Sequence, residues 1–201
     1  MMELLLPRSC GGCGRAGVRW CQRCQRQWLA PPQRISTTTD PHVPVWSMGA
    51  FGQSRRRSII HLKERGRRDL IPFISASVAA AVEYLIAAGE LDHDAILVPA
   101  PTKRSSARKR GGDPVYAVCK QTGYRSEQAL WEKESMRDSV GLDVAARRRN
   151  VMGKVELVSR PSRPVLLVDD VVTTGATIAE SVAVLTSAGV KVRGALGWAS
   201  S

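Results

Sequence analysis

The 201-residue sequence is poor in aromatic and acidic side chains and lacks the long apolar runs of a membrane protein. Aromatic residues make up 5% of the chain, and 18 acidic residues stand against 30 basic ones. No uninterrupted apolar run approaches the roughly 18 residues needed to cross a bilayer, so we expect no membrane insertion. The apolar stretch within residues 1–7 is too short for a signal peptide and lacks a basic start, which predicts a cytoplasmic protein.

The surplus of basic residues gives a formal net charge of +12, which favours an anionic partner such as nucleic acid, a phosphorylated metabolite or an acidic surface. Hydrophobic residues at 43% and charged residues at 24% exclude wholesale disorder. The net charge is +7 over residues 1–60 and +5 over residues 61–201, and residues 31–44 are rich in proline and threonine. We therefore expect a cysteine module over residues 1–30, a linker over residues 31–45 and one larger domain over residues 46–201.

Four of the five cysteines form the pattern Cys10-x2-Cys13-x7-Cys21-x2-Cys24. Two Cys-x-x-Cys turns supply four thiolates in the tetrahedral arrangement that structural Zn²⁺ prefers. The spacing predicts a structural zinc site that holds a segment too short to form a core of its own. A pair of redox dithiols, or four cysteines with no joint role, are the alternatives. The fifth cysteine, Cys119, lies in an apolar, helix-like stretch and is expected to be a buried core thiol.

Basic and aromatic side chains are interleaved with the four cysteines. Arginines can contact phosphates, and Trp20 and Trp28 can stack on bases, so the module is a candidate nucleic-acid site. The alternative is a solvated basic face around a structural metal, and the sequence leaves both readings open. The candidate nucleic-acid residues are Arg15, Arg19, Arg23 and Arg26.

The strongest pattern lies near the C-terminus, where the apolar run 165–168 is followed by Asp169 and Asp170 and then by a loop of threonines and Gly175. The run is typical of a strand covered on both faces of a parallel sheet, and residues 176–188 predict a helix. Strand, loop and helix in this order place the loop at the carboxyl edge of the sheet, where open α/β folds bind ligands.

The residue types of this loop suit a ribose phosphate. Backbone N–H groups at a helix N-terminus favour a phosphate, and threonine hydroxyls add donors. Asp169 and Asp170 would repel a phosphate but can accept hydrogen bonds from a sugar diol, with a divalent cation nearby. A core strand with an incidental acidic turn is the alternative. No Gly-x4-Gly-Lys-Ser/Thr motif occurs, which excludes a P-loop NTPase.

The remaining chain alternates between expected helices and strands, which predicts an α/β fold. Proline at position 72 is expected to break a helical stretch early. The expected helices cover residues 54–88 and 114–122, and the expected strands cover residues 95–98, 128–132, 155–158 and 190–198.

The run from Val168 to Thr177 resembles the phosphoribosyl-pyrophosphate (PRPP) motif of type I phosphoribosyltransferases. Four cysteines ahead of such a domain resemble the ComF/GntX-like branch of that family. Three further segments are similar to it: Ile60-His61-Leu62-Lys63 with Gly66-Arg67-Arg68, residues 97–101 with Arg110-Gly111, and Arg147 or Arg148 with Asn150-Val151 and Gly153. The resemblance implies a twisted, mainly parallel sheet flanked by helices, with a small N-terminal zinc-binding module.

By this resemblance, PRPP or another ribose 5-phosphate binds with Mg²⁺ at the edge of the sheet. The residues implied to hold it are Asp169, Asp170, Val171, Thr173, Thr174, Gly175, Ala176 and Thr177. A strand end and the basic loop beyond it would face the pyrophosphate, although a solvated basic loop is the alternative. That set is Ala100, Lys103, Arg104, Arg108, Lys109 and Arg110.

The resemblance implies two functions that do not exclude each other. The first is Mg²⁺-dependent transfer of a phosphoribosyl group to an unknown acceptor. The second is a non-catalytic factor that acts with single-stranded DNA and the DNA-uptake machinery of competent bacteria, in which the PRPP fold serves binding or regulation. The sequence departs from the family at Gly112-Asp113-Pro114, at Met136 and Ser139, and at Lys154-Val155. PRPP binding is therefore expected, whereas turnover stays open, and neither the histidines nor any other residue stands out as a general base.

Overall fold

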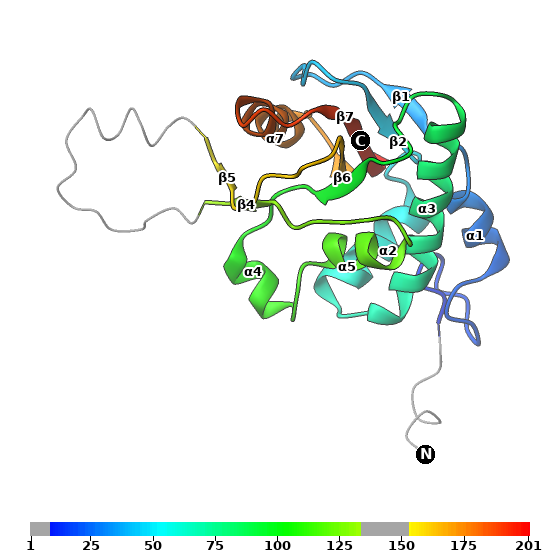
Figure 1. Ribbon diagram of the computed structural model, residues 1–201. Coiled ribbons are helices and arrows are strands. Elements are labelled where there is room, and N and C mark those ends of the chain that lie inside the picture. The colour runs from blue at the N-terminus through cyan, green and yellow to red at the C-terminus, as the bar shows by residue number, and fades with distance from the viewer. Residues whose placement is uncertain (1–8, 134–152) are drawn as a thin grey trace.

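The computed structural model describes residues 9–133 and 153–201, which form a mixed α/β fold around a five-stranded sheet (Figure 1). Four strands run parallel, and one edge strand pairs antiparallel to its neighbour. The mostly parallel sheet confirms the expected fold class at this level. In spatial order the strands are β1 (Gln33–Ile35), β2 (Val45–Ser47), β7 (Val192–Ser200), β6 (Val165–Val172) and β3 (Ile96–Pro99).

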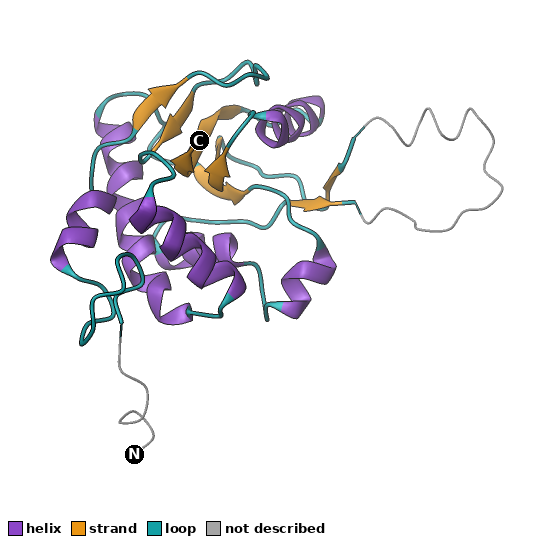
Figure 2. Ribbon diagram, turned by 180° about the vertical axis from the view of Figure 1, so that it is seen from behind, coloured by secondary structure: helices purple, strands orange, loops and turns teal. Residues whose placement is uncertain are grey.

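Helices cover both faces of this sheet (Figure 2). They are α1 (Gln22–Trp28), α2 (Gln53–Glu64), the 3₁₀ turn η1 (Arg68–Leu70), α3 (Ile71–Ala87), α4 (Arg104–Lys109), α5 (Pro114–Gln121) and α7 (Ala176–Ser187). A separate antiparallel pair is formed by β4 (Leu130–Glu132) and β5 (Val155–Leu157). Met136, Ser139, Arg147, Arg148, Asn150 and Val151, which were compared with the family above, lie outside the described residues.

The alternation of side chains along β6 divides the core into two parts. Leu166 and Val168 pack with residues of α2, α3 and α5, whereas Val165 and Leu167 pack with residues of α7 on the other face. A strand buried on both faces must be apolar at every position. This explains why the continuous run 165–168 was recognisable in the sequence.

Several elements differ from the sequence expectation in their limits. β6 does not end at residue 168 but continues to Val172, so Asp169 and Asp170 belong to the strand. Pro72 lies in the first turn of α3, where its missing N–H costs nothing, and it does not break the helix. The basic segment after Pro101 is not a loop throughout, because α4 occupies most of it.

The segment expected as a linker also contains regular structure. β1 lies within residues 31–45 and pairs with β2, which joins β7 in the main sheet. The sequence did not indicate this strand because it has only three residues and two of them are exposed. Residues 36–44 therefore form the connection of a β1–β2 hairpin at the edge of the sheet.

The cysteine module packs into the larger of the two cores. Cys10, Cys21, Cys24, Trp20 and Trp28 share one buried cluster with residues of α3 and β7. The Trp20 ring stacks on Phe73 of α3, with ring centroids 5.6 Å apart. The module thus shares the core of the chain, in addition to any stabilisation that a metal provides.

The helical stretch Arg68–Ala87, made of η1 and α3, is long and apolar enough to cross a membrane by length and composition. Ser75, Ser77 and Glu83 interrupt its apolar residues, so the sequence shows no uninterrupted run there. Half of the window is buried in the protein. A core helix of a soluble protein passes the same test, so this is weak evidence for a membrane span. The cytoplasmic location stays a prediction.

Candidate functional site

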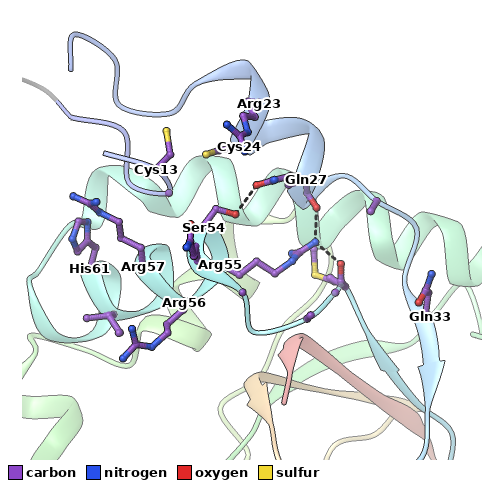
Figure 3. A pocket seen from close by; sticks show the side chains of 18 of the residues that line it. Cys13, Arg23, Cys24, Gln27, Gln33, Ser54, Arg55, Arg56, Arg57 and His61 are labelled. Carbon is purple, nitrogen blue, oxygen red and sulfur yellow. Dashed lines mark hydrogen bonds between the residues drawn. The ribbon is translucent and has the colours of Figure 1, made fainter. Parts of the chain in front are cut away.

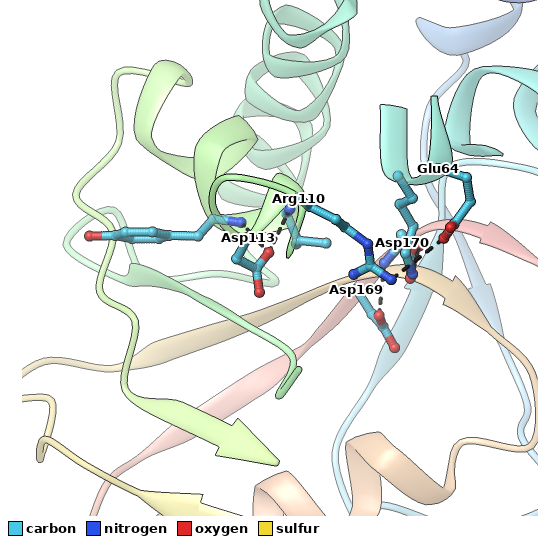
Figure 4. Close-up of polar contacts among 8 residues, drawn as sticks. Glu64, Arg110, Asp113, Asp169 and Asp170 are labelled. Carbon is cyan, nitrogen blue, oxygen red and sulfur yellow. Dashed lines mark hydrogen bonds and ion pairs between the residues drawn. The ribbon is translucent and has the colours of Figure 1, made fainter. Parts of the chain in front are cut away.

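The carboxyl end of β6 carries two adjacent carboxylates, one of which is ion-paired (Figure 4). Asp170 is 7% exposed, and its Oδ2 lies 2.6 Å from Nζ of Lys63 on α2. The backbone N–H of Asp170 donates to Oδ1 of Asp169 at 2.8 Å. The sequence placed both carboxylates at this edge, but it did not indicate Lys63 as their partner, because that contact joins residues far apart in the chain.

The charge of Asp170 affects the ionisation of Asp169. Burial, followed by the nearby negative charge of Asp170, raises the pKa of the Asp169 carboxyl well above its usual range. The positive charge of Lys63 opposes that shift. A ligand that supplied positive charge or hydroxyl donors at this point would favour ionisation of Asp169.

Residues 173–177, which the sequence predicts to bind a phosphate and which are called the phosphate loop below, connect β6 with α7 and present polar groups to solvent. Thr173, Thr174 and Thr177 are exposed, and Thr174 Oγ1 accepts a hydrogen bond from the backbone N–H of Ala176. Gly175 adopts a φ of 81°, which favours glycine, and forms the N-terminal cap of α7. Exposed hydroxyls beside a helix N-terminus make this loop suited to an anion.

The β1–β2 hairpin lies against the phosphate loop. The backbone N–H of Thr39 donates to the carbonyl of Thr174 at 2.8 Å, and Thr37 Oγ1 donates to the carbonyl of Thr39. A Cβ atom at Gly175 would lie 2.6 Å from Cβ of Thr37, so only glycine fits under the hairpin. Sequence reasoning missed this contact because residues 31–45 were taken for a linker.

Three of the basic residues expected to face pyrophosphate form ion pairs with different acidic side chains. Lys103 pairs with Glu132 at 3.7 Å, and Arg104 pairs with Glu156 at 2.7 Å, both on the small β4–β5 sheet. Arg110 lies 3.5 Å from Glu64. Of the other residues in the set, Arg108 interacts with another group of the protein, and Ala100 is buried and donates its backbone N–H to the carbonyl of Val168. Lys109 lines the cavity described next.

A cavity of about 250 Å³ lies between the C-terminal end of α2 and the loop that precedes α5. It is lined by Lys63, Glu64, Lys109, Arg110 and Asp113, among others. Oδ1 of Asp113 accepts hydrogen bonds from the backbone N–H groups of Val115 and Tyr116 and caps α5. Burial raises the pKa of Asp113, and these two N–H groups oppose the shift. The departure Gly112-Asp113-Pro114 therefore begins a helix next to the acidic strand end.

The four cysteines of the module converge. Their Sγ atoms all lie within 4.8 Å of one another, and Cys13 Sγ is 3.6 Å from Cys21 Sγ. A tetrahedral zinc with Zn–S bonds of about 2.3 Å needs sulfurs about 3.8 Å apart, so the arrangement fits a metal of this kind. Four close cysteines that could bind a structural metal such as zinc confirm the sequence prediction at this level.

The surroundings of the sulfurs act on Cys24 and Cys10 in opposite directions, because burial, followed by contact with the neighbouring sulfurs, raises the pKa of the Cys24 thiol. Burial disfavours ionisation of Cys10, but backbone N–H groups of Cys13, Cys21 and Gly12 lower the pKa of its thiol to about 6. Gly12 leaves room for Cys24, since a Cβ at that glycine would lie 2.7 Å from the Cys24 sulfur. Cys119 lies apart from this group and is fully buried, as expected for a core thiol.

The candidate nucleic-acid residues of the module are exposed, but its tryptophans are not. Trp20 is 5% exposed and Trp28 is fully buried. The expectation that these rings stack on bases is therefore wrong, because both are used in the core. The exposed arginines of the set are Arg15, Arg19, Arg23 and Arg26, of which Arg19 already interacts within the protein.

Comparison of the sequence with protein-family models and with curated proteins finds no match. The resemblance to ComF-type phosphoribosyltransferases therefore depends on the motifs and on the geometry described above.

Proposed function

We propose that the chain binds PRPP, or another ribose 5-phosphate, at the carboxyl end of β6 as a type I phosphoribosyltransferase-like protein of the ComF type. One observation carries this proposal. Two adjacent carboxylates near the end of a buried parallel strand are followed, two residues later, by an exposed threonine loop and the N-terminus of α7. The carboxylates and the loop match the two ends of a ribose 5-phosphate, a diol and a phosphate.

In this proposal each end of the ligand has its own binding groups. The 5′-phosphate accepts hydrogen bonds from Thr173, Thr177 and the backbone N–H groups at the start of α7. The 2′- and 3′-hydroxyls donate to Asp169 and Asp170. A divalent cation bound together with PRPP would neutralise part of the charge on its pyrophosphate.

Lys63 links this site to the pyrophosphate side. Its ammonium group pairs with Asp170 at a separation of 2.6 Å. Hydroxyl donors from a bound ribose would compete for the same carboxylate, which leaves Lys63 available to a pyrophosphate oxygen. If the protein transfers phosphoribosyl groups, Lys63 would then stabilise the charge that develops on the leaving group.

Calorimetric titration with PRPP and Mg²⁺ tests the proposal. Asp169→Asn combined with Asp170→Asn should weaken binding at least tenfold, since two acceptors of the diol are changed. Asp92→Asn is the matched control, because Asp92 pairs with Lys191 and Arg193 away from the loop and should leave binding unchanged. Undiminished PRPP binding by the double variant would exclude this ribose site.

A second candidate function is association with single-stranded DNA during DNA uptake, in which the PRPP fold serves binding or regulation. The exposed arginines of the cysteine module favour it, with Arg23 and Arg26 on the surface of α1. Because the module's tryptophans are buried, contact would be made with the phosphate backbone. Oligonucleotide affinity should then fall steeply with salt, and affinity that is independent of salt would exclude such contact.

A further inference from the structure

A basic groove of about 1170 Å³ lies between the cysteine module and α2 (Figure 3). One wall comes from the module and includes Arg23, Cys13 and Cys24, and the other comes from α2 and the segment that precedes it. Among the described residues that line this groove, none is an aspartate or a glutamate. Five arginines line it: Arg23, Arg55, Arg56, Arg57 and Arg65.

Arg55 differs from the other four arginines because it is used by the fold. It is 6% exposed and donates to the backbone carbonyls of Gln27, Met48 and Trp198. The other four are exposed. Within residues 9–133 and 153–201, none of those four lies within salt-bridge distance of a carboxylate. Their charges are therefore available to a ligand.

A buried imidazole in the same groove also lacks a partner. His61 lies on α2, is 6% exposed, and its Nδ1 has no hydrogen-bond partner among the described residues. Burial lowers the pKa of His61, and the charges of Arg57, Arg65 and Arg67 lower it further. The groove therefore combines an unpaired, buried polar atom with positive charge that the protein does not neutralise.

The metal site does not account for all of this charge. Four thiolates around a divalent metal carry a net charge of about −2, while the lining contributes five arginines. Because Arg55 is buried and used by the fold, the four exposed arginines leave about two positive charges on this concave surface. A structural role in balancing the thiolates would need fewer arginines than the groove holds.

We propose that the basic groove is a second anion site for a molecule that carries two or more closely spaced phosphate groups. It lies apart from the phosphate loop and does not depend on the PRPP proposal. Exposed guanidinium groups from both walls can donate paired, bidentate hydrogen bonds to phosphate oxygens. Among the described residues no phenylalanine, tryptophan or tyrosine lines the groove, so the proposal concerns contacts with phosphates and not stacking on bases.

Such phosphate groups can belong to a free oligophosphate or to a nucleic-acid backbone, and one experiment separates the two sources. Fluorescence or calorimetric titration is carried out on the full, metal-loaded chain with inorganic tripolyphosphate and with a single-stranded oligonucleotide. Arg56→Glu combined with Arg57→Glu should lower affinity about a hundredfold, since each lost contact costs roughly tenfold. Arg23→Glu tests the opposite wall and should cost about tenfold.

Two controls keep the result specific. Arg125→Glu combined with Arg160→Glu changes the charge equally at exposed positions outside the groove and should alter affinity less than threefold. The Asp169→Asn and Asp170→Asn pair should leave the affinity for tripolyphosphate unchanged. If tripolyphosphate were bound at the phosphate loop instead, it would bind more tightly to this variant, because it has no diol that needs those carboxylates and their negative charges would be gone. Far-UV circular dichroism and the metal content of each variant verify its folding.

The outcomes divide clearly. If the groove variants lose affinity for tripolyphosphate only, the site is supported and its ligand is a free oligophosphate. If they lose affinity for the oligonucleotide only, the site is supported and its ligand is a nucleic-acid backbone. Equal losses in the groove and control variants would mean a diffuse attraction to a basic protein and would overturn the proposal. Absence of binding by both probes at physiological salt would overturn it as well.

Discussion

The cysteine module and the carboxyl end of β6 are both built from short sequence motifs, but the side chains of the module are mostly buried, whereas those that follow β6 are exposed. Three of the four cysteines are buried, and Trp20 and Trp28 pack around them in the core. At the end of β6, Thr173, Thr174 and Thr177 remain exposed. A site with a structural role satisfies its groups from within the chain, whereas a site for a ligand leaves donors for the ligand to use.

The two regions are not independent, because Arg55 links the module to the sheet that ends in the phosphate loop. Its guanidinium joins the end of α1, the end of β2 and the strand β7, and it lies over the ring of Trp28 at 4.9 Å. Burial lowers the pKa of Arg55 to about 10. The Arg55 guanidinium, bound to three backbone carbonyls in the core, therefore connects the cysteine module to the sheet by specific hydrogen bonds. Four substitutions test how the two regions differ.

The largest effect is expected from Cys24→Ala, which removes a buried cysteine of the cluster that could hold a structural metal. Loss of the metal and of the packing around it should lower the free energy of unfolding by about 4 kcal/mol. Urea denaturation and metal analysis measure both consequences. Cys119→Ala is the matched control, because it changes a fully buried thiol outside the cluster and should keep the metal. A Cys24→Ala protein that holds its full metal content would contradict the assignment.

The next largest effect is expected from Arg55→Met, which leaves three carbonyl groups without their donor. The free energy of unfolding should fall by about 3 kcal/mol, because an unpaired buried acceptor costs about 1–3 kcal/mol. Arg34→Met serves as the control, since Arg34 is exposed on β1. Equal stability of the two variants would show that Arg55 does not fasten the module to the sheet.

Gly175→Ala should have an intermediate effect, confined to the phosphate loop and the hairpin that covers it. The added Cβ would collide with Thr37, and alanine would have to adopt the positive φ of this position. Together these two effects should lower the free energy of unfolding by about 2 kcal/mol. Gly123→Ala is a close control, because its φ is 86° but nothing lies within 4 Å of the added atom. The difference between the two variants in thermal denaturation measures the docking of the hairpin, and a difference near zero would argue against it.

The smallest effect is expected in the pH dependence of stability. The raised pKa of Asp169 means that the folded protein holds a proton that the unfolded chain releases near pH 3.8, so stability should fall as pH rises from about 4 through the raised pKa. Asp169→Asn should remove this fall, seen in urea titrations across pH, while Asp92→Asn should leave it. A wild-type profile that stays flat over this range would contradict the shift.

Sequence reasoning succeeded where the chemistry is local. The spacing of Cys10, Cys13, Cys21 and Cys24 predicted their convergence, and the apolar run before Asp169 predicted a buried parallel strand. It failed where a short segment gains its structure from distant partners. β1 has three residues and no strong pattern, and Trp20 and Trp28 look as suitable for base stacking as for a core until Phe73 and Arg55 are placed beside them.

The sequence by itself determined the cysteine cluster, the buried strand that begins at residue 165 and the loop and helix that follow it, because spacing and periodicity encode geometry over a few residues. Only the tertiary structure decided that Lys63 neutralises Asp170, that Thr37 covers Gly175, and that arginines of the module and of α2 face one groove. These contacts join residues far apart in the chain. They depend on how whole helices and strands pack, which no local pattern records.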